Sequence, residues 1–262
     1  SEMSHMRPDL LPGLLQAAAR NQARGFADLA FFEVGPVWAG GTPEDQSLHA
    51  TGLLTGHSGP RDALGARRPV DVFDAKADAE AALAALSAPT GLMVLRNAPG
   101  WFHPGRSGVL SLGPKTPLAV FGELHPKLLE AMDVKGPAVA FAVMVAAVPT
   151  PKRSGAARPA LAISDFQAVE RDFAFVVDAE TEAQALLRAA RGADKTLVAD
   201  VSLFDVFDGP AAEAQMGDGK KSVAIAVRLE PKSGTLTDAQ IEAVSQKIVA
   251  NVAKATGGVL RG

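Results

Sequence analysis

The sequence predicts an α+β protein in two parts, because three patterns follow one another along the chain. Short apolar runs separated by Gly, Pro and polar turns fill residues 1–148 with few helical stretches between them, as in a largely antiparallel sheet. Proline, glycine and positive charge then displace the apolar pattern over residues 149–165. Residues 166–262 carry strand and helix signals in the order βαββαβ, which is the ferredoxin-like arrangement.

An amphipathic helix is predicted to open the first part. Leucines at positions 10, 11, 14 and 15 lie near the i, i+3, i+4 spacing over Leu10–Arg20, so one helix face needs an apolar partner. Strand-like runs and two more helices follow. The predicted strands are Leu29–Trp38, His49–Thr55, Leu92–Leu95, Val109–Leu112, Leu118–Leu124 and Ala138–Val148. The predicted helices are Lys76–Leu86, with Asp74 as its cap, and Pro126–Met132.

The segment 149–165 is the predicted linker between a first domain, 1–148, and a second domain, 166–262. Lys152, Arg153 and Arg158 give the linker positive charge. Two roles fit these side chains equally: contact with a phosphate backbone, or a solvated hinge.

The second part begins with a half-buried strand, Arg171–Asp178, in which Phe173 and Phe175 share one face. Two capping boxes, Thr181–Gln184 and Thr237–Gln240, predict where helices begin. The first helix is expected to reach Ala190. The remaining predicted elements are the strands Thr196–Asp208, Lys220–Glu230 and Val259–Arg261, and a last helix with the apolar stripe Ile241, Val244, Ile248 and Val252, ended by Gly257 and Gly258.

In this arrangement both helices cover one face of the sheet and leave the other bare. The outward residues of the third strand are then Ser222, Ala224, Ala226 and Arg228, a small and polar surface suited to docking. Acidic residues nevertheless outnumber Lys and Arg from Phe166 to Gly262, and paired aromatic residues for base stacking are lacking. Electrostatics alone therefore make a weak case for RNA binding.

Composition removes several classes of function. The absence of cysteine excludes disulfides, thiolate metal sites and cysteine nucleophiles. The five histidines show no metal-binding spacing, and the glycine-rich stretch before Lys220 leads into a strand, so we interpret it as a hairpin turn and not as a phosphate-binding loop. No apolar run approaches the roughly 20 residues of a membrane-spanning helix. We expect a cytoplasmic protein and, since the sequence starts without Met, a fragment of a longer one.

Eight short strings identify a resemblance that covers essentially the whole chain. In order they are 6–15 (MRPDLLPGLL), 32–35 (FEVG), 102–107 (FHPGRS), 122–126 (GELHP), 171–175 (RDFAF), 203–207 (LFDVF), 219–222 (GKKS) and 235–238 (TLTD). At these intervals they resemble the C-terminal part of the bacterial phenylalanyl-tRNA synthetase beta subunit.

The resemblance implies a fold and a role for each part. Residues 1–148 are expected to be a class II synthetase-like antiparallel sheet without an active site, and residues 166–262 a ferredoxin-fold anticodon-binding domain. In this family the alpha subunit activates phenylalanine with ATP and magnesium, and a heterotetramer of two alpha and two beta chains charges tRNA(Phe). The implied partners are therefore the alpha subunit and tRNA(Phe), with no DNA, no membrane and no cofactor held by this fragment.

Specific residues follow from these expectations. Class II catalysis needs arginines that grip ATP, and Leu29–Trp38 contains none, so we expect no catalytic residue. Arg106 is the one tempting substitute, although a structural or interface role is favoured. Glu123 and His125 are expected to be structural, and the first helix is expected to pack against the alpha subunit. The predicted tRNA-facing set, chosen from strand edges and the open sheet face, is Arg171, Lys220, Lys221, Arg228 and Arg261.

Two other classes use the ferredoxin-like arrangement. An acylphosphatase-like enzyme needs an anion-binding loop after the first strand, where Asp178 and Glu180 would repel phosphate. A small-molecule sensor that binds an amino acid remains the alternative. Tight binding of free phenylalanine by this chain alone, measured by calorimetry, would favour the sensor.

Overall fold

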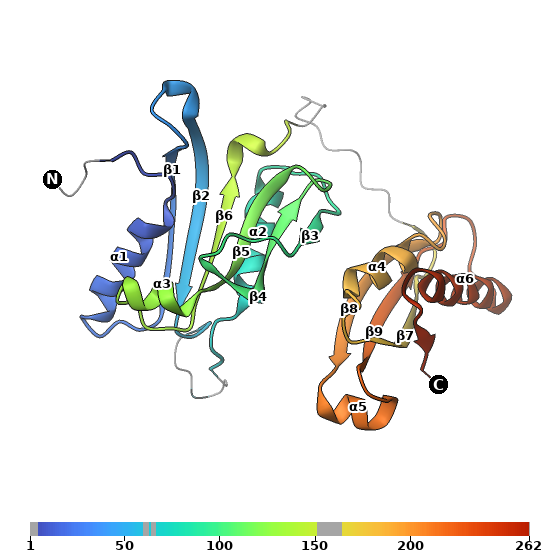
Figure 1. The fold of residues 1–262 in the computed structure, drawn as a ribbon. Helices are drawn as coiled ribbons and strands as arrows, with labels where there is room; N and C mark the ends of the chain where they lie inside the picture. Colours follow the sequence, from blue (N-terminus) through green and yellow to red (C-terminus); the bar gives the residue numbers. More distant parts are fainter. Residues whose placement is uncertain (1–4, 60–62, 64–66, 151–163, 262) are drawn as a thin grey trace. The chain divides into compact units, whose positions relative to one another are not determined.

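The chain divides into two compact units, Ser1–Ala156 and Ala157–Gly262, in the computed structural model (Figure 1). The structure describes residues 5–59, 63, 67–150 and 164–261. Most of the predicted linker, including Lys152, Arg153 and Arg158, therefore lies outside the described residues.

The N-terminal unit is built on one six-stranded antiparallel sheet with the strand order β1-β2-β6-β5-β4-β3. Its elements are α1 (Leu11–Gln22), β1 (Leu29–Trp38), η1 (Pro43–Asp45), β2 (Gln46–Thr55), α2 (Val72–Ala85), β3 (Met93–Leu95), β4 (Phe102–Ser111), β5 (Pro117–Leu124), α3 (Pro126–Ala131), β6 (Ala138–Met144) and η2 (Val145–Ala147). The predicted α+β class with antiparallel pairing is confirmed.

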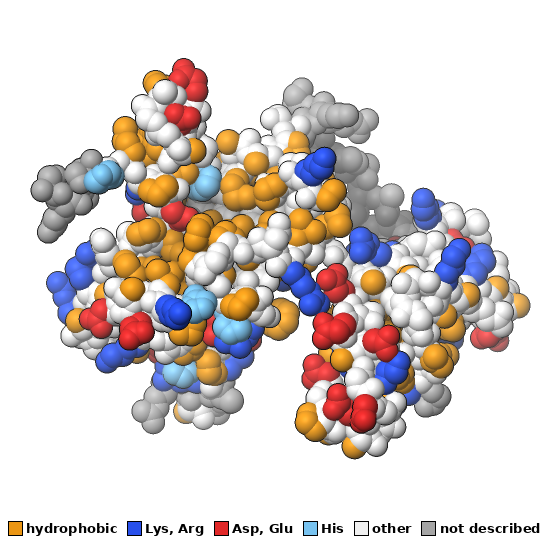
Figure 2. Space-filling model, in the orientation of Figure 1, with side chains coloured by type: hydrophobic (Ala, Val, Ile, Leu, Met, Phe, Trp, Pro, Cys, Tyr) orange, Lys and Arg blue, Asp and Glu red, His pale blue; other side chains and the backbone are white. Residues whose placement is uncertain are grey.

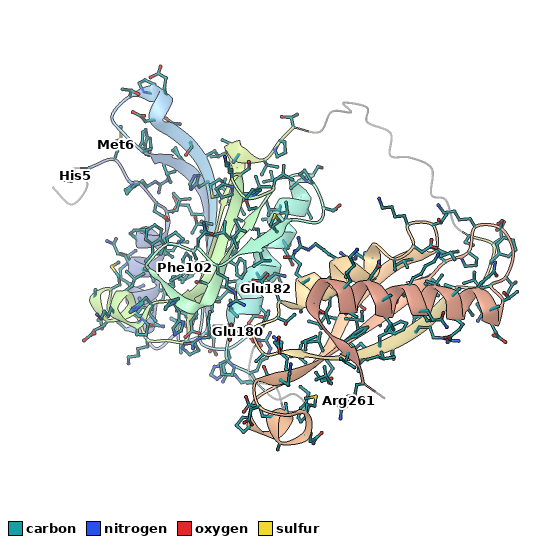
Figure 3. The ribbon with its side chains drawn as sticks, turned by 45° about the vertical axis from the view of Figure 1, so that its right-hand side comes forward. His5, Met6, Phe102, Glu180, Glu182 and Arg261 are labelled. Atoms are coloured by element: carbon teal, nitrogen blue, oxygen red, sulfur yellow. The ribbon has the colours of Figure 1, made fainter. Side chains whose placement is uncertain are left out.

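Helices cover both faces of this sheet (Figure 1). On one face α1 and α3 enclose a core that includes Leu53 and Phe102, of which Phe102 is labelled in Figure 3. On the other face α2 packs over β5 and β6. The leucine stripe of α1 is buried within this unit, with Leu15 only 1% exposed. The chain's own sheet therefore supplies the apolar partner of this stripe, and the expectation that the helix packs against the alpha subunit stays a prediction.

Two local predictions in this unit have different outcomes. Asp71, and not Asp74, caps α2: its carboxylate accepts the N–H groups of Phe73 and Asp74, while Asp74 bonds back to the backbone of Asp71. The helix thus begins one turn earlier than the apolar pattern indicated. His125 caps α3 as expected, since its Nδ1 accepts the N–H of Lys127 at 3.1 Å.

The C-terminal unit has a four-stranded antiparallel sheet with the order β10-β7-β9-β8, as the ferredoxin-like arrangement requires. Its elements are β7 (Val169–Asp178), α4 (Ala183–Arg191), β8 (Val198–Phe207), α5 (Pro210–Met216), β9 (Lys220–Leu229), α6 (Asp238–Thr256) and β10 (Val259–Leu260). Both long helices pack on one face, where the predicted α6 stripe joins Phe173, Phe175 and Ile225 in the core.

Of the two capping boxes predicted in this unit, one is confirmed and the other is wrong. Thr237 caps α6 through a capping box with Gln240, and Gly257 ends the helix in the left-handed conformation. Thr181 does not cap α4, because the chain first turns back on Asp178 and the helix starts only after Glu182. The helix α5 lies where the sequence pattern predicted only a loop.

Candidate nucleic-acid interface

Lys220 and Arg228 lie toward opposite ends of β9 on the helix-free face of the sheet. They are eight positions apart in the strand, about 26 Å. Both are close to carboxylates: the ammonium group of Lys220 bonds Asp178 at 2.5 Å, and the guanidinium group of Arg228 lies 4.0 Å from Glu230. Neighbouring acidic side chains therefore offset the charge that was expected to attract phosphate.

Arg171 and Arg261 are the two members of the predicted set that the structure brings together. Both line a groove of about 600 Å³ between α6 and the edge of β7. Arg171 is opposite Val227 in the strand register, which places it on the helix-covered side of the sheet and not on the open face. The backbone N–H of Arg261 (Figure 3) donates to Ala174 at 2.8 Å and extends the β10 pairing. Lys221 follows Lys220 and also belongs to the covered side, opposite Val177.

The open face is less accessible and more acidic than the sequence indicated. Ser222 and Ala224, expected to face outward, are only 5% and 8% exposed, because they are short side chains between two flanking strands and α5 packs against β9. The strand register places a set of acidic residues on this face: Glu170, Asp172, Asp178, Asp200 and Asp205. Figure 2 shows Asp and Glu side chains gathered over β8 and α5. A phosphate backbone would be repelled from this surface.

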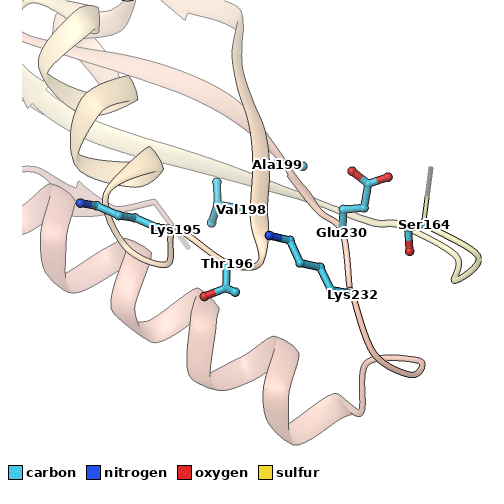
Figure 4. A pocket seen from close by; sticks show the side chains of 7 residues that line it. All are labelled: Ser164, Lys195, Thr196, Val198, Ala199, Glu230 and Lys232. Carbon is cyan, nitrogen blue, oxygen red and sulfur yellow. The ribbon is translucent and has the colours of Figure 1, made fainter. Parts of the chain in front are cut away.

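A different cationic site lies at one end of the same sheet. β8 begins there, β9 ends there and the chain enters β7, and together they surround a hollow of about 370 Å³ (Figure 4). Two lysines, Lys195 and Lys232, line the hollow with Ser164, Thr196 and Glu230. Figure 4 shows the Lys232 side chain reaching over the hollow toward Val198. Sequence reasoning missed this pair because the two lysines are far apart in the chain and lie in loops; the predicted βαββαβ order already brings these loops to one end of the sheet.

Hydrogen bonds fix the backbone around this hollow. Asp194 accepts the N–H groups of Thr196 and Leu197 at 3.0 and 3.1 Å, and these bonds, with that from Thr196 as the largest cause, lower the pKa of its carboxyl below the ordinary value. The N–H of Glu230 donates to Leu197 at 2.8 Å, and the hydroxyl of Ser164 donates to the carbonyl of Pro231.

Two arginines at the sheet of the N-terminal unit, Arg7 and Arg106, are each held by a carboxylate. Arg106 donates two hydrogen bonds to Glu123, and this pairing lowers the pKa of the Glu123 carboxyl. Arg7 bonds Glu33 at 2.6 Å and the carbonyl of Pro36 at 3.0 Å. These side chains do not fit an ATP site. Within the described part of the chain, no group of three or more His, Asp or Glu residues could hold a metal ion.

Exposed apolar side chains mark the outer edge of this unit. On the edge strand β1, Phe32 is 79% exposed and Val34 57% exposed, and Leu48 of the paired strand β2 is also exposed. Adjacent exposed apolar side chains are typical of a surface that another protein covers. No helix in the described residues is both long and apolar enough to cross a membrane.

Comparison with known families divides the chain in the same order as the fold. Residues 1–145 match the model of the phenylalanyl tRNA synthetase beta chain CLM domain. Residues 164–261 match the model of the ferredoxin-fold anticodon binding domain. The two matches agree with the resemblance seen in the eight sequence strings.

Individual relatives extend over the full length of this chain. It is 66% identical to a phenylalanine–tRNA ligase beta subunit from Cereibacter sphaeroides, 63% identical to one from Ruegeria pomeroyi and 51% identical to one from Brucella suis. Each alignment covers 100% of this chain but only 32% or 33% of the relative. The chain thus spans about a third of the length of these relatives, and it belongs to the phenylalanyl-tRNA synthetase beta subunit family.

Proposed function

We propose that this chain is the part of a phenylalanine–tRNA ligase beta subunit that binds the anticodon region of tRNA(Phe) and supports the catalytic alpha subunit. The observation that carries the proposal is the match of residues 164–261 to an anticodon-binding family, on a sheet with the required strand order. The proposed division is a non-catalytic core module over residues 1–148, a linker over 149–165 and an anticodon-binding domain over 166–262.

In this proposal the chemistry belongs to the alpha subunit, which uses ATP and Mg²⁺ in the heterotetramer. Two arginines of the N-terminal unit support this division, because Arg7 and Arg106 are held by Glu33 and Glu123 and are not available to grip a triphosphate. The exposed Phe32 and Val34 support a docking role for this unit.

Removal of residues 164–262 from the complete beta subunit, followed by assembly with the alpha subunit, tests the proposal. We expect phenylalanine-dependent ATP–pyrophosphate exchange to continue, whereas kcat/KM for charging tRNA(Phe) should fall at least tenfold. The chain alone should show no exchange. Unchanged tRNA charging by the truncated enzyme, or exchange by the isolated chain, would refute the assignment.

A further inference from the structure

We propose that the hollow between Lys195, Lys232 and Glu230 holds one ribose–phosphate unit of an RNA strand. Lys232, which reaches over the hollow, binds the phosphate, Lys195 at the rim adds positive charge, and Glu230 accepts a hydrogen bond from the ribose 2′-hydroxyl. This inference rests on the proposed tRNA binding and assigns it to the end of the sheet, away from the open face.

The ion pairing of the lysines in this unit supports a phosphate ligand. Among the described residues, neither Lys195 nor Lys232 forms an ion pair, whereas Lys220 bonds Asp178 and Lys247 lies 3.5 Å from Asp194. An unpaired ammonium group can meet a phosphate without first losing a protein partner, so it contributes more to binding than a paired one.

The backbone around the hollow is already ordered for binding. Asp194 holds the loop that carries Lys195, and the bond between Glu230 and Leu197 joins the end of β9 to the start of β8. A site whose frame is fixed before binding loses less conformational entropy when the ligand arrives. The volume of about 370 Å³ falls within the range of small-ligand sites, roughly 300–1,000 Å³.

Glu230 determines which part of the nucleotide fits beside the lysines. An ionised carboxylate is only an acceptor and repels phosphate, so its ligand must bring a donor. The ribose 2′-hydroxyl is such a donor, and RNA has it whereas DNA does not. The guanidinium group of Arg228, 4.0 Å from Glu230, partly balances the charge of this carboxylate.

The test measures binding of the full chain to an RNA stem-loop with the anticodon arm sequence of tRNA(Phe). The variants are Lys195→Ala, Lys232→Ala and the double variant, with Lys254→Ala as a matched control. Lys254 is also exposed and does not line the hollow. We expect each site variant to weaken binding about fivefold and the double variant, which loses one phosphate contact, to reduce the salt slope by roughly 0.7, while Lys254→Ala changes little.

A second arm tests the ribose contact. Stem-loops with a single 2′-deoxy substitution at each loop position in turn are compared between the unmodified chain and Glu230→Gln. At one loop position, we expect the 2′-deoxy substitution to lower the affinity for the unmodified chain about fivefold. The same substitution should lower the affinity for Glu230→Gln by less, because its amide is a weaker acceptor.

The outcomes distinguish the site from the general function. If the site variants and Lys254→Ala weaken binding to the stem-loop equally, this inference is overturned. The proposed anticodon binding then still stands. Loss of affinity in the lysine variants with no sensitive 2′-position overturns the ribose assignment. Absence of any binding by the unmodified chain overturns both the inference and the proposed function.

Discussion

The contact between Gly52 and Phe141 predicts that one added methyl group destabilises the N-terminal unit. Gly52 lies on β2 directly opposite Phe141 of β6, and the aromatic ring covers the glycine. A Cβ atom at position 52 would lie 2.2 Å from Cε1 and 2.7 Å from Cζ of that ring. Ordinary contact needs at least 3.4 Å, so the ring or the strand must move by more than 1 Å.

The expected loss of stability in Gly52→Ala depends on how far the Phe141 ring can move. Phe141 is 9% exposed and packs with Val139 and Val143 against α2, so it cannot swing into solvent freely. Overpacking of this kind costs about 1–3 kcal/mol. Replacing glycine by alanine also lowers the conformational entropy of the unfolded chain, which stabilises the folded state by about 0.4–1 kcal/mol. We expect Gly52→Ala to lower the free energy of unfolding by about 1–2 kcal/mol.

Tryptophan fluorescence in a urea titration measures this change selectively. The chain has two tryptophans, Trp38 and Trp101, both in the N-terminal unit, and no tyrosine. Gly41→Ala is the matched control, because a Cβ atom there meets nothing within 4 Å. The double variant Gly52→Ala with Phe141→Leu should recover part of the loss. A Gly52→Ala chain as stable as the control, or a double variant in which the two losses simply add, would refute the reasoning.

Three further predictions concern a helix cap, an ion pair and an exposed ring. Thr237→Ala removes the capping hydroxyl of α6 and should cost about 1 kcal/mol, seen as a lower urea midpoint by circular dichroism; no loss would exclude the capping role. Because Arg106 lowers the pKa of the Glu123 carboxyl, the contribution of this pair is present above the ordinary value near 4.5 and disappears as the pH falls through the lowered pKa. The stability difference between the native chain and Glu123→Gln should therefore vanish toward low pH, and a constant difference would contradict it. Phe32→Ser should leave stability within about 0.5 kcal/mol yet weaken copurification with the alpha subunit, and equal recovery would refute the docking role.

Local patterns in the sequence predict most of the regular structure. Strict alternation from Val223 to Leu229 predicts β9, and the stripe from Ile241 to Val252 predicts α6, since each pattern has one period and one buried face. The short helix α5 escapes this reasoning, because its seven residues bury only Ala212 and show no period.

The candidate interface was less predictable, since it depends on which strands lie side by side. The ion pair between Lys220 and Asp178 joins β9 to β7, and the residues are 42 positions apart. The position of Arg171 could have been found, because it has the same parity as Phe173 and so shares its covered face. Lys195 and Lys232 line the same hollow only because the folded sheet brings the ends of β8 and β9 together.

The most direct test of the central claim compares the affinity of this chain for tRNA(Phe) with its affinity for the same tRNA carrying three replaced anticodon nucleotides. Anticodon binding predicts that the replacement weakens binding at least tenfold, since loss of one good base contact costs roughly 1–3 kcal/mol. Equal affinity for the two tRNAs would contradict the assignment of residues 166–262 as an anticodon-binding domain.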